Sequence, residues 1–211
     1  MKKFLYLLSF LTLCTSLSYA DDLMNGLNAY EKSDYDSAVT FFQSGCDADN
    51  AEACYNLGNM YDSGLGVYKD KDDAKAVSLF TKSCDGGFSD GCYNLGIMYD
   101  TGEGVAKDAI KAFTLFYKSC ESGHTRGCYS VALMYYKGQG VQKDYSKALS
   151  LFQKTCDEGY EKSCYNLGVM YRNGEGVAKN LDKALELYKR ACEQNLSIAC
   201  DKYGKLRNEM Q

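Results

Sequence analysis

Cysteine is the residue type whose number and spacing most directly indicate chemistry in this 211-residue chain. Ten of its 11 cysteines form five pairs with an eight-residue spacing, and Cys14 stands apart near the N-terminus. Zinc sites favour two cysteines separated by two residues, which do not occur here, and His124 is the only histidine. The pattern therefore favours disulfides over a metal site. The paired positions are Cys46 and Cys54, Cys84 and Cys92, Cys120 and Cys128, Cys156 and Cys164, and Cys192 and Cys200.

The first 20 residues have the three-part pattern of a secretory signal peptide. A basic start is followed by a mostly apolar run from Phe4 to Leu13, and Ser18-Tyr19-Ala20 supplies a cleavage site. Cleavage near Ala20 would remove Cys14 and leave ten cysteines in a secreted or periplasmic chain, where disulfides persist. The apolar run is too short for a stable membrane anchor. In the alternative, Cys14 would be acylated as in a lipoprotein, although Leu13 is bulky for that motif.

The pairing of the ten cysteines follows from counting them. Joining each cysteine to its partner eight residues away uses all ten. Joining across the longer gap, Cys54 to Cys84 and onward, would leave Cys46 and Cys200 without partners. We therefore predict five disulfides, each between the end of one helix and the start of the next. The alternative is a set of free buried thiols.

The sequence around the cysteines repeats, with successive pairs beginning 38, 36, 36 and 36 residues apart. The segment Cys54-Tyr-Asn-Leu-Gly-Asn-Met-Tyr61 recurs at 92–99 and 164–171, and more loosely at 128–135. A Gly-x-Gly turn and a second segment, such as Lys75-Ala-Val-Ser-Leu-Phe-Thr-Lys-Ser-Cys84, follow each copy. A fixed period of about 20–50 residues indicates a repeat array.

Both segments of the repeat have the periodicity of an α-helix. Cys54, Leu57, Gly58 and Tyr61 form a single helical stripe, and the second segment has a similar one. Glycine at positions 58, 96 and 168 predicts that a neighbouring helix approaches closely there. The fold class is therefore all-α, an array of helical hairpins with one disulfide per hairpin.

We expect a single repeat domain over residues 21–211, after a signal peptide at 1–20. Residues from about 23 to 46 would form an opening helix pair, and the cysteine-paired repeats would follow from about 46 to 200. A polar C-terminal cap from about 198 to 211 would close the array, as repeat proteins require.

The repeat motifs resemble those of a known family. The pattern A-C-Y-N-L-G-x-M-Y-x-x-G-x-G-V-x-K-D, joined to K-A-x-x-L-F-x-K-S-C-x-x-G, is similar to the cysteine-rich form of the Sel1-like repeat found in the Helicobacter cysteine-rich protein family. The similarity covers about residues 35–207. It implies a right-handed α/α solenoid related to tetratricopeptide repeats, secreted or periplasmic, with each cysteine pair bridging a helical hairpin. The family description also implies a β-lactamase or penicillin-binding activity.

The first helix of each repeat is the element that normally lines the concave groove of such a solenoid. Tyrosine and asparagine side chains lie off its core stripe, and these types bind peptides through flat contact area and uncharged hydrogen bonds. In the alternative, the Tyr-Asn pairs only bridge neighbouring repeats. The candidate groove residues are Tyr55, Asn56, Asn59, Tyr93, Asn94, Tyr129, Tyr165 and Asn166.

The residues support binding better than catalysis. The S-x-x-K, S-D-N and K-T-G motifs of serine β-lactamases do not occur, and His124 is expected to be a solvent-facing turn residue. We predict no catalytic residue, metal or cofactor. The formal net charge of −4 argues against a nucleic-acid partner. The favoured hypothesis is a monomeric scaffold that binds peptides, proteins or cell-wall peptides. The alternatives are a β-lactam hydrolase and a purely structural envelope protein.

Overall fold

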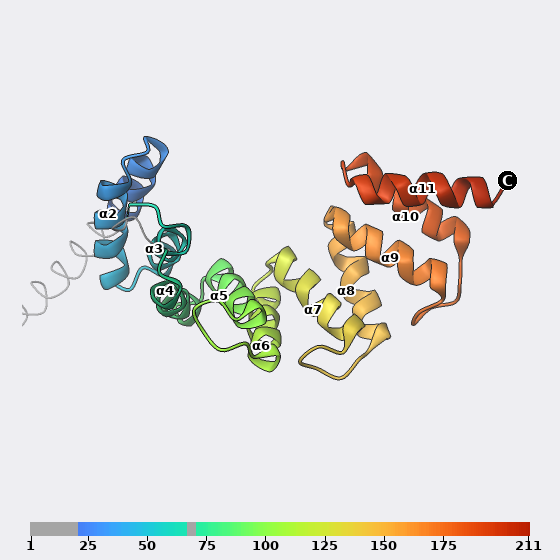
Figure 1. Ribbon diagram of the computed structural model, residues 1–211, viewed down its shortest axis with the longest axis horizontal. Coiled ribbons are helices and arrows are strands. Elements are labelled where there is room, and N and C mark those ends of the chain that lie inside the picture. The colour runs from blue at the N-terminus through green and yellow to red at the C-terminus, as the bar shows by residue number, and fades with distance from the viewer. Residues whose placement is uncertain (1–20, 67–70) are drawn as a thin grey trace, which may run out of the picture. The chain divides into compact units, whose positions relative to one another are not determined.

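The computed structural model describes residues 21–66 and 71–211, and both ranges are built mainly from helices (Figure 1). The predicted signal peptide and Cys14 lie outside the described residues. The described chain is helical over 21–31 and then contains ten helices of 13 residues each. These are α2 (Tyr35–Asp47), α3 (Ala51–Ser63), α4 (Asp73–Asp85), α5 (Ser89–Thr101), α6 (Ala109–Glu121), α7 (Thr125–Lys137), α8 (Tyr145–Asp157), α9 (Glu161–Asn173), α10 (Leu181–Glu193) and α11 (Ser197–Glu209).

Short polar side chains and glycines set the ends of these helices. Asn50 precedes α3, and its side chain accepts a hydrogen bond from the backbone N–H of Ala53. This bond satisfies one of the amides that a helix start leaves unpaired. Gly64 ends α3 with φ of 70°, a left-handed conformation that glycine adopts without steric strain. The Gly-x-Gly motif thus ends α3 and begins the connection to α4.

The chain divides into two compact units, unit 1 (Met1–Asp108) and unit 2 (Ala109–Gln211), which we describe separately. Within each unit, consecutive helices pack against one another as the hairpins of a solenoid (Figure 1). This confirms the predicted all-α fold. We call the 21–31 helix, α3, α5, α7, α9 and α11 the first helices, and α2, α4, α6, α8 and α10 the second helices.

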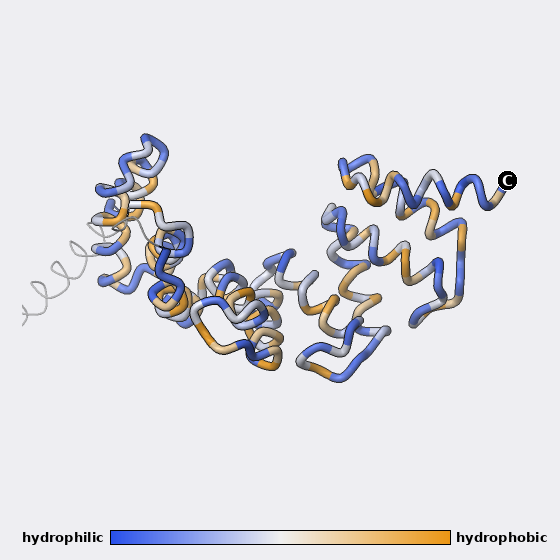
Figure 2. The backbone as a smooth tube through the Cα atoms, in the orientation of Figure 1, coloured by the Kyte–Doolittle hydropathy of each residue, from blue (hydrophilic) through white to orange (hydrophobic). Residues whose placement is uncertain are grey.

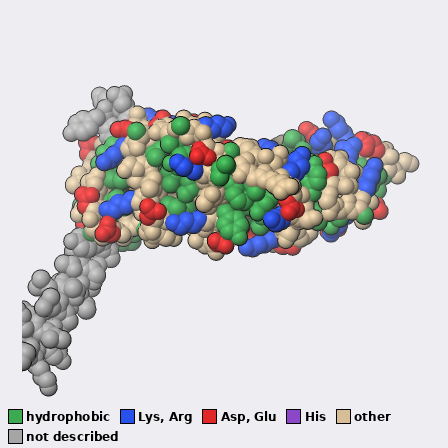
Figure 3. Space-filling model, turned by 90° about the horizontal axis from the view of Figure 1, so that it is seen from below, with side chains coloured by type: hydrophobic (Ala, Val, Ile, Leu, Met, Phe, Trp, Pro, Cys, Tyr) green, Lys and Arg blue, Asp and Glu red, His purple; other side chains and the backbone are tan. Residues whose placement is uncertain are grey.

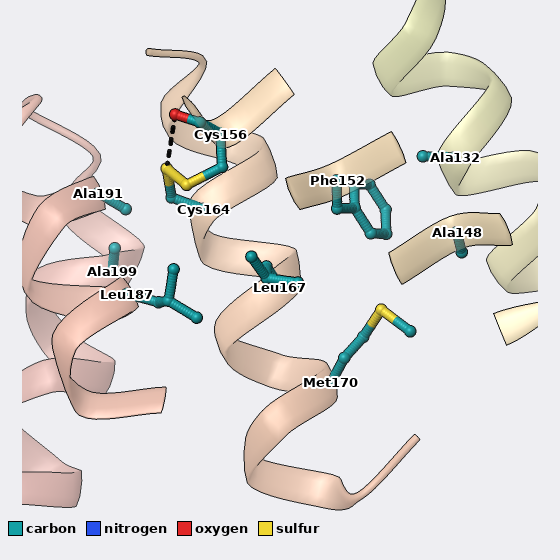
Figure 4. Close-up of a cluster of buried hydrophobic side chains, with 10 residues drawn as sticks. All are labelled: Ala132, Ala148, Phe152, Cys156, Cys164, Leu167, Met170, Leu187, Ala191 and Ala199. Atoms are coloured by element: carbon teal, nitrogen blue, oxygen red, sulfur yellow. Dashed lines mark hydrogen bonds between the residues drawn. A yellow bond between two sulfur atoms is a disulfide. The ribbon is translucent and has the colours of Figure 1, made fainter. Parts of the chain in front are cut away.

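The core of each unit is formed by the apolar stripes that the periodicity predicts. In Figure 2 hydrophobic and hydrophilic residues alternate along the helices, as expected for helices with one buried face. In unit 1, Cys54 and Leu57 are fully buried with Phe42. In unit 2, Leu167 and Phe152 are buried in the cluster of Figure 4. The predicted stripe therefore faces the core in both units.

Two glycines in the first helices allow an aromatic ring to pack directly on the backbone. A Cβ atom at Gly58 would lie 2.7 Å from Cε1 of Phe80, and one at Gly168 would lie 2.8 Å from Cε1 of Tyr188. Real Cβ atoms do not approach other atoms so closely, so only glycine fits at these two sites. The predicted close approach is therefore present at positions 58 and 168.

Five disulfides join the end of each second helix to the start of the following first helix. Their Cα–Cα distances are 4.4–4.7 Å, and each links cysteines eight residues apart. In Figure 4, Sγ of Cys164 also lies 3.6 Å from the carbonyl oxygen of Cys156. One disulfide per helical hairpin is thus confirmed. Because disulfides persist in oxidising compartments, they indicate an extracytoplasmic environment.

The molecular surface carries charges of both signs. On the face in Figure 3, Lys and Arg side chains alternate with Asp and Glu, and hydrophobic side chains lie between them. Among the described helices, none is both long and apolar enough to cross a membrane.

Candidate functional site

All eight predicted groove residues lie on first helices and are half-buried. Tyr55, Asn56 and Asn59 come from α3, and Tyr93 and Asn94 come from α5 in the same unit. In unit 2, the tyrosine of α7 and the Tyr-Asn pair of α9 occupy the equivalent positions. The buried stripe of each first helix faces the core, and these side chains lie next to that stripe. They are therefore in reach of both solvent and the next repeat.

Three of these residues line a hollow in unit 1 with a volume of about 480 Å³. This size falls within the range of about 300–1,000 Å³ that is usual for ligand sites. The ring of Phe42 is almost fully buried, whereas Tyr30 at the edge is 43% exposed. The hollow is thus open and has both aromatic and amide groups. Its lining residues are Leu27, Tyr30, Phe42, Tyr55, Asn56, Asn59, Asp62, Ser63 and Leu65.

Other predicted residues bond to one another between successive first helices. In unit 1, Nδ2 of Asn94 donates to Oδ1 of Asn59 over 2.9 Å. In unit 2, Nδ2 of Asn166 donates to the hydroxyl of Tyr129 over 3.2 Å. These asparagines therefore bridge repeats, the alternative role considered from the sequence. Asn59 does both, since it accepts this bond and lines the hollow.

The tyrosines pack against aromatic rings of the second helices and their turns, in tilted or edge-on arrangements. Tyr55 lies 5.1 Å from Phe88, and Tyr129 lies 4.9 Å from Tyr160, between ring centroids. Tyr165 lies 5.8 Å from Tyr188, whose burial raises the pKa of its hydroxyl to about 12. Such pairs add about 0.5–1.5 kcal/mol beyond area burial. The tyrosine rings thus stabilise the array in addition to any contact with a ligand.

A cluster of charges beside the hollow was not singled out from the sequence. Nζ of Lys71 lies 3.4 Å from Asp62, 3.1 Å from Asp73 and 3.7 Å from Glu103. Its hydrogen bond to Asp73, together with the charge of Asp62, raises the pKa of the Lys71 ammonium group. Asp62 lies in α3, but Lys71 and Glu103 lie in loops whose position no periodicity predicts.

His124 has a different role from the expected one. It is half-buried rather than solvent-facing, and it precedes α7. Its Nδ1 accepts a hydrogen bond from the backbone N–H of Gly127 over 3.1 Å. The side chain therefore caps α7 in the way that Asn50 caps α3. The position of His124 directly before a predicted helix was the signal in the sequence that could have indicated this role.

Candidate metal ligands do not gather in the described parts of the chain. Over 21–66 and 71–211, no group of three or more His, Cys, Asp or Glu side chains is arranged to hold an ion.

The chain matches a family model described as the Sel1 repeat five times, at residues 19–50, 51–88, 89–124, 125–160 and 161–196. In this register each fully described repeat has one first and one second helix, and each disulfide joins one repeat to the residues that follow it. In repeat 89–124, for example, Cys120 of the second helix is joined to Cys128 of the next repeat. In repeat 125–160, Cys156 is joined in the same way to Cys164. The disulfides therefore connect repeats, while the Gly-x-Gly turns connect the helices within a repeat.

Three solved structures illustrate the similarity. A Sel1 repeat protein from Oxalobacter formigenes is 27% identical, with a TM-score of 0.77, over 83% of this chain and 72% of that one. A protective antigen of uropathogenic Escherichia coli is 27% identical, with a TM-score of 0.82, over 89% of this chain but only 41% of that one. Helicobacter pylori cysteine rich protein B is 28% identical, with a TM-score of 0.50, over 62% and 92%. No match was found among curated proteins.

Proposed function

Because this chain belongs to the Sel1 repeat family, whose members are generally protein-interaction scaffolds, we propose that it binds peptide segments of partner proteins on its first helices. The hollow in unit 1 is the observation that carries this proposal, since three predicted groove residues line it. It offers aromatic contact area, which favours peptide binding, and amides that can bond a peptide backbone. The mature chain acts in the periplasm or outside the cell, after removal of a signal peptide.

The amides keep capacity for a ligand even where they already take part in internal bonds. A carboxamide has two N–H donors and an oxygen with two lone pairs. Asn56 uses one N–H to bond the carbonyl oxygen of Glu52, and Asn59 accepts one bond from Asn94. Each side chain therefore retains groups that can pair with an extended peptide backbone.

Site-specific photo-cross-linking tests this proposal. A photoreactive phenylalanine analogue is introduced at Asn56 on a first helix, or at Thr81, an exposed position on the second helix α4. The oxidised protein is irradiated with envelope and growth-medium fractions. We expect adducts from position 56 and none from position 81. Equal adducts from both positions, or none from position 56, would contradict binding on the first helices.

A further inference from the structure

The first helices of unit 1 have an unusual charge composition. The helix over 21–31, α3 and α5 contain no lysine or arginine, whereas they carry Asp21, Asp22, Glu31, Glu52, Asp62, Asp90 and Asp100. The first helices of unit 2 are different, because α7, α9 and α11 contain more basic than acidic residues. The elements that form the hollow are therefore acidic.

The same excess of negative charge is present at the edge of the hollow. Asp62 lines it and is paired with Lys71, but that single ammonium group is shared with Asp73 and Glu103. Among the described residues of this cluster, three carboxylates surround one cation, which leaves two net negative charges. The side chains of Asp62 and Lys71 are each more than two-fifths exposed, so a cation from a ligand can approach the cluster from solvent.

The inner wall of the hollow is apolar. Leu27, Tyr55 and Leu65 contribute aliphatic and aromatic surface next to the amides of α3, over the buried ring of Phe42. Phe42 is held in place because its ring packs on Gly26, where a Cβ atom would lie only 2.5 Å away. An apolar wall held rigidly beside a negative edge matches a segment that carries an apolar and a basic side chain together.

We propose that the hollow of unit 1 binds a partner segment in which an aliphatic or aromatic side chain lies next to a lysine or arginine. The apolar side chain occupies the hollow against Leu27 and Tyr55, and the cation lies beside Asp62. Asn56 and Asn59 bond the backbone of the segment. This inference rests on the proposed function, and adds to it the chemistry of the partner.

Selection from a random peptide library displayed on phage tests the proposal on the oxidised full chain. Enriched peptides are synthesised with a fluorophore, and their dissociation constants are measured by fluorescence anisotropy. We expect the enriched peptides to contain leucine, methionine or phenylalanine beside lysine or arginine. Their binding should weaken as salt rises, because the charge pair is partly exposed.

Three variants locate the binding site. Asp62→Asn removes the charge without changing the shape and should weaken binding about two- to fivefold. Ser63→Trp places a large ring at the exposed end of α3, where Ser63 lines the hollow, and should abolish binding. Asp201→Asn makes the same charge change on a first helix of unit 2 and should leave binding unchanged. Helicity and the number of disulfides are verified for each variant.

The possible results separate the two proposals. Enrichment of acidic peptides, or of peptides that bind the Ser63→Trp variant as tightly as the wild type, would overturn the assignment to the hollow while leaving peptide binding intact. An Asp201→Asn variant that weakens binding as much as Asp62→Asn would also overturn the assignment to the hollow. A selection that enriches no peptide would contradict both proposals.

Discussion

A methyl group added at Gly168 should be less favourable than one added at Gly204, although the two glycines occupy the same position of the repeat. At Gly168 the added Cβ atom would lie 2.8 Å from Cε1 and 2.9 Å from Cδ1 of Tyr188, a ring that is almost fully buried. At Gly204 the added carbon would have no heavy atom within 4 Å, apart from those of its chain neighbours and of the backbone of its own helix. Comparing the two variants therefore isolates the energetic effect of the Tyr188 ring that packs on Gly168.

The expected magnitudes follow from two contributions. Alanine is favoured over glycine in a helix interior by about 1 kcal/mol, and both variants gain this. Overpacking a filled core costs about 1–3 kcal/mol, and only Gly168→Ala incurs it. Gly204→Ala should therefore raise the free energy of unfolding by about 1 kcal/mol. Gly168→Ala should be the less stable of the two by about 1–3 kcal/mol, because the shared gain cancels.

Urea unfolding of the oxidised proteins, followed by far-ultraviolet circular dichroism, measures this difference. The midpoints can be compared if the slopes agree. Hydrogen exchange of the α9 and α11 amides then shows whether each effect is local. The reasoning is refuted if Gly168→Ala is as stable as Gly204→Ala, or if Gly204→Ala is less stable than the wild type.

Three further predictions concern the disulfides, the bridging amides and the pH dependence. Replacing both Cys156 and Cys164 by alanine should lower the free energy of unfolding by roughly 2–3 kcal/mol, measured by urea unfolding, because the short loop is no longer closed in the unfolded chain; an unchanged midpoint would contradict this. A double-mutant cycle with Asn166→Ala and Tyr129→Phe should give a coupling of about 0.5–1.5 kcal/mol for their hydrogen bond, and strictly additive effects would show that it does not stabilise the fold. Burial raises the pKa of Tyr188 to about 12 from its ordinary value of 10.0. The folded state therefore retains the proton after the unfolded state loses it, so the contribution of Tyr188 to stability should be constant below pH 10 and decline as the pH rises toward 12. Tyr188→Phe should show a smaller decline in the urea midpoint over that range, and an identical decline would contradict this assignment.

Much of the fold could be predicted because its determinants are local and repeated. The eight-residue cysteine spacing is compatible with one pairing that leaves no orphan, and the structure has one such disulfide in each hairpin. The stripe of Cys54, Leu57, Gly58 and Tyr61 predicted which face of α3 packs on the core. The first three are buried, and Tyr61 is half-buried against them. His124 was misjudged because turn position alone does not distinguish a free side chain from one that caps the next helix.

The candidate site could be predicted only in part. The sequence placed eight tyrosines and asparagines at the edge of the core stripe, and all eight are half-buried there. It did not distinguish Asn56, which lines the hollow, from Asn166, which bonds Tyr129 of another repeat. Both occupy the same position of the motif, so their difference comes from what surrounds them in space.

The sequence by itself therefore determined the repeat, the helices and the pairing of the cysteines, because each depends on residues within one period of the chain. Only the tertiary structure decided which equivalent side chains bridge repeats and which line an open hollow. Asn59 and Asn94 are 35 residues apart, and Lys71 reaches Glu103 across 32 residues. Such contacts depend on how successive hairpins pack and on where their loops turn, and the spacing of a motif does not contain that information.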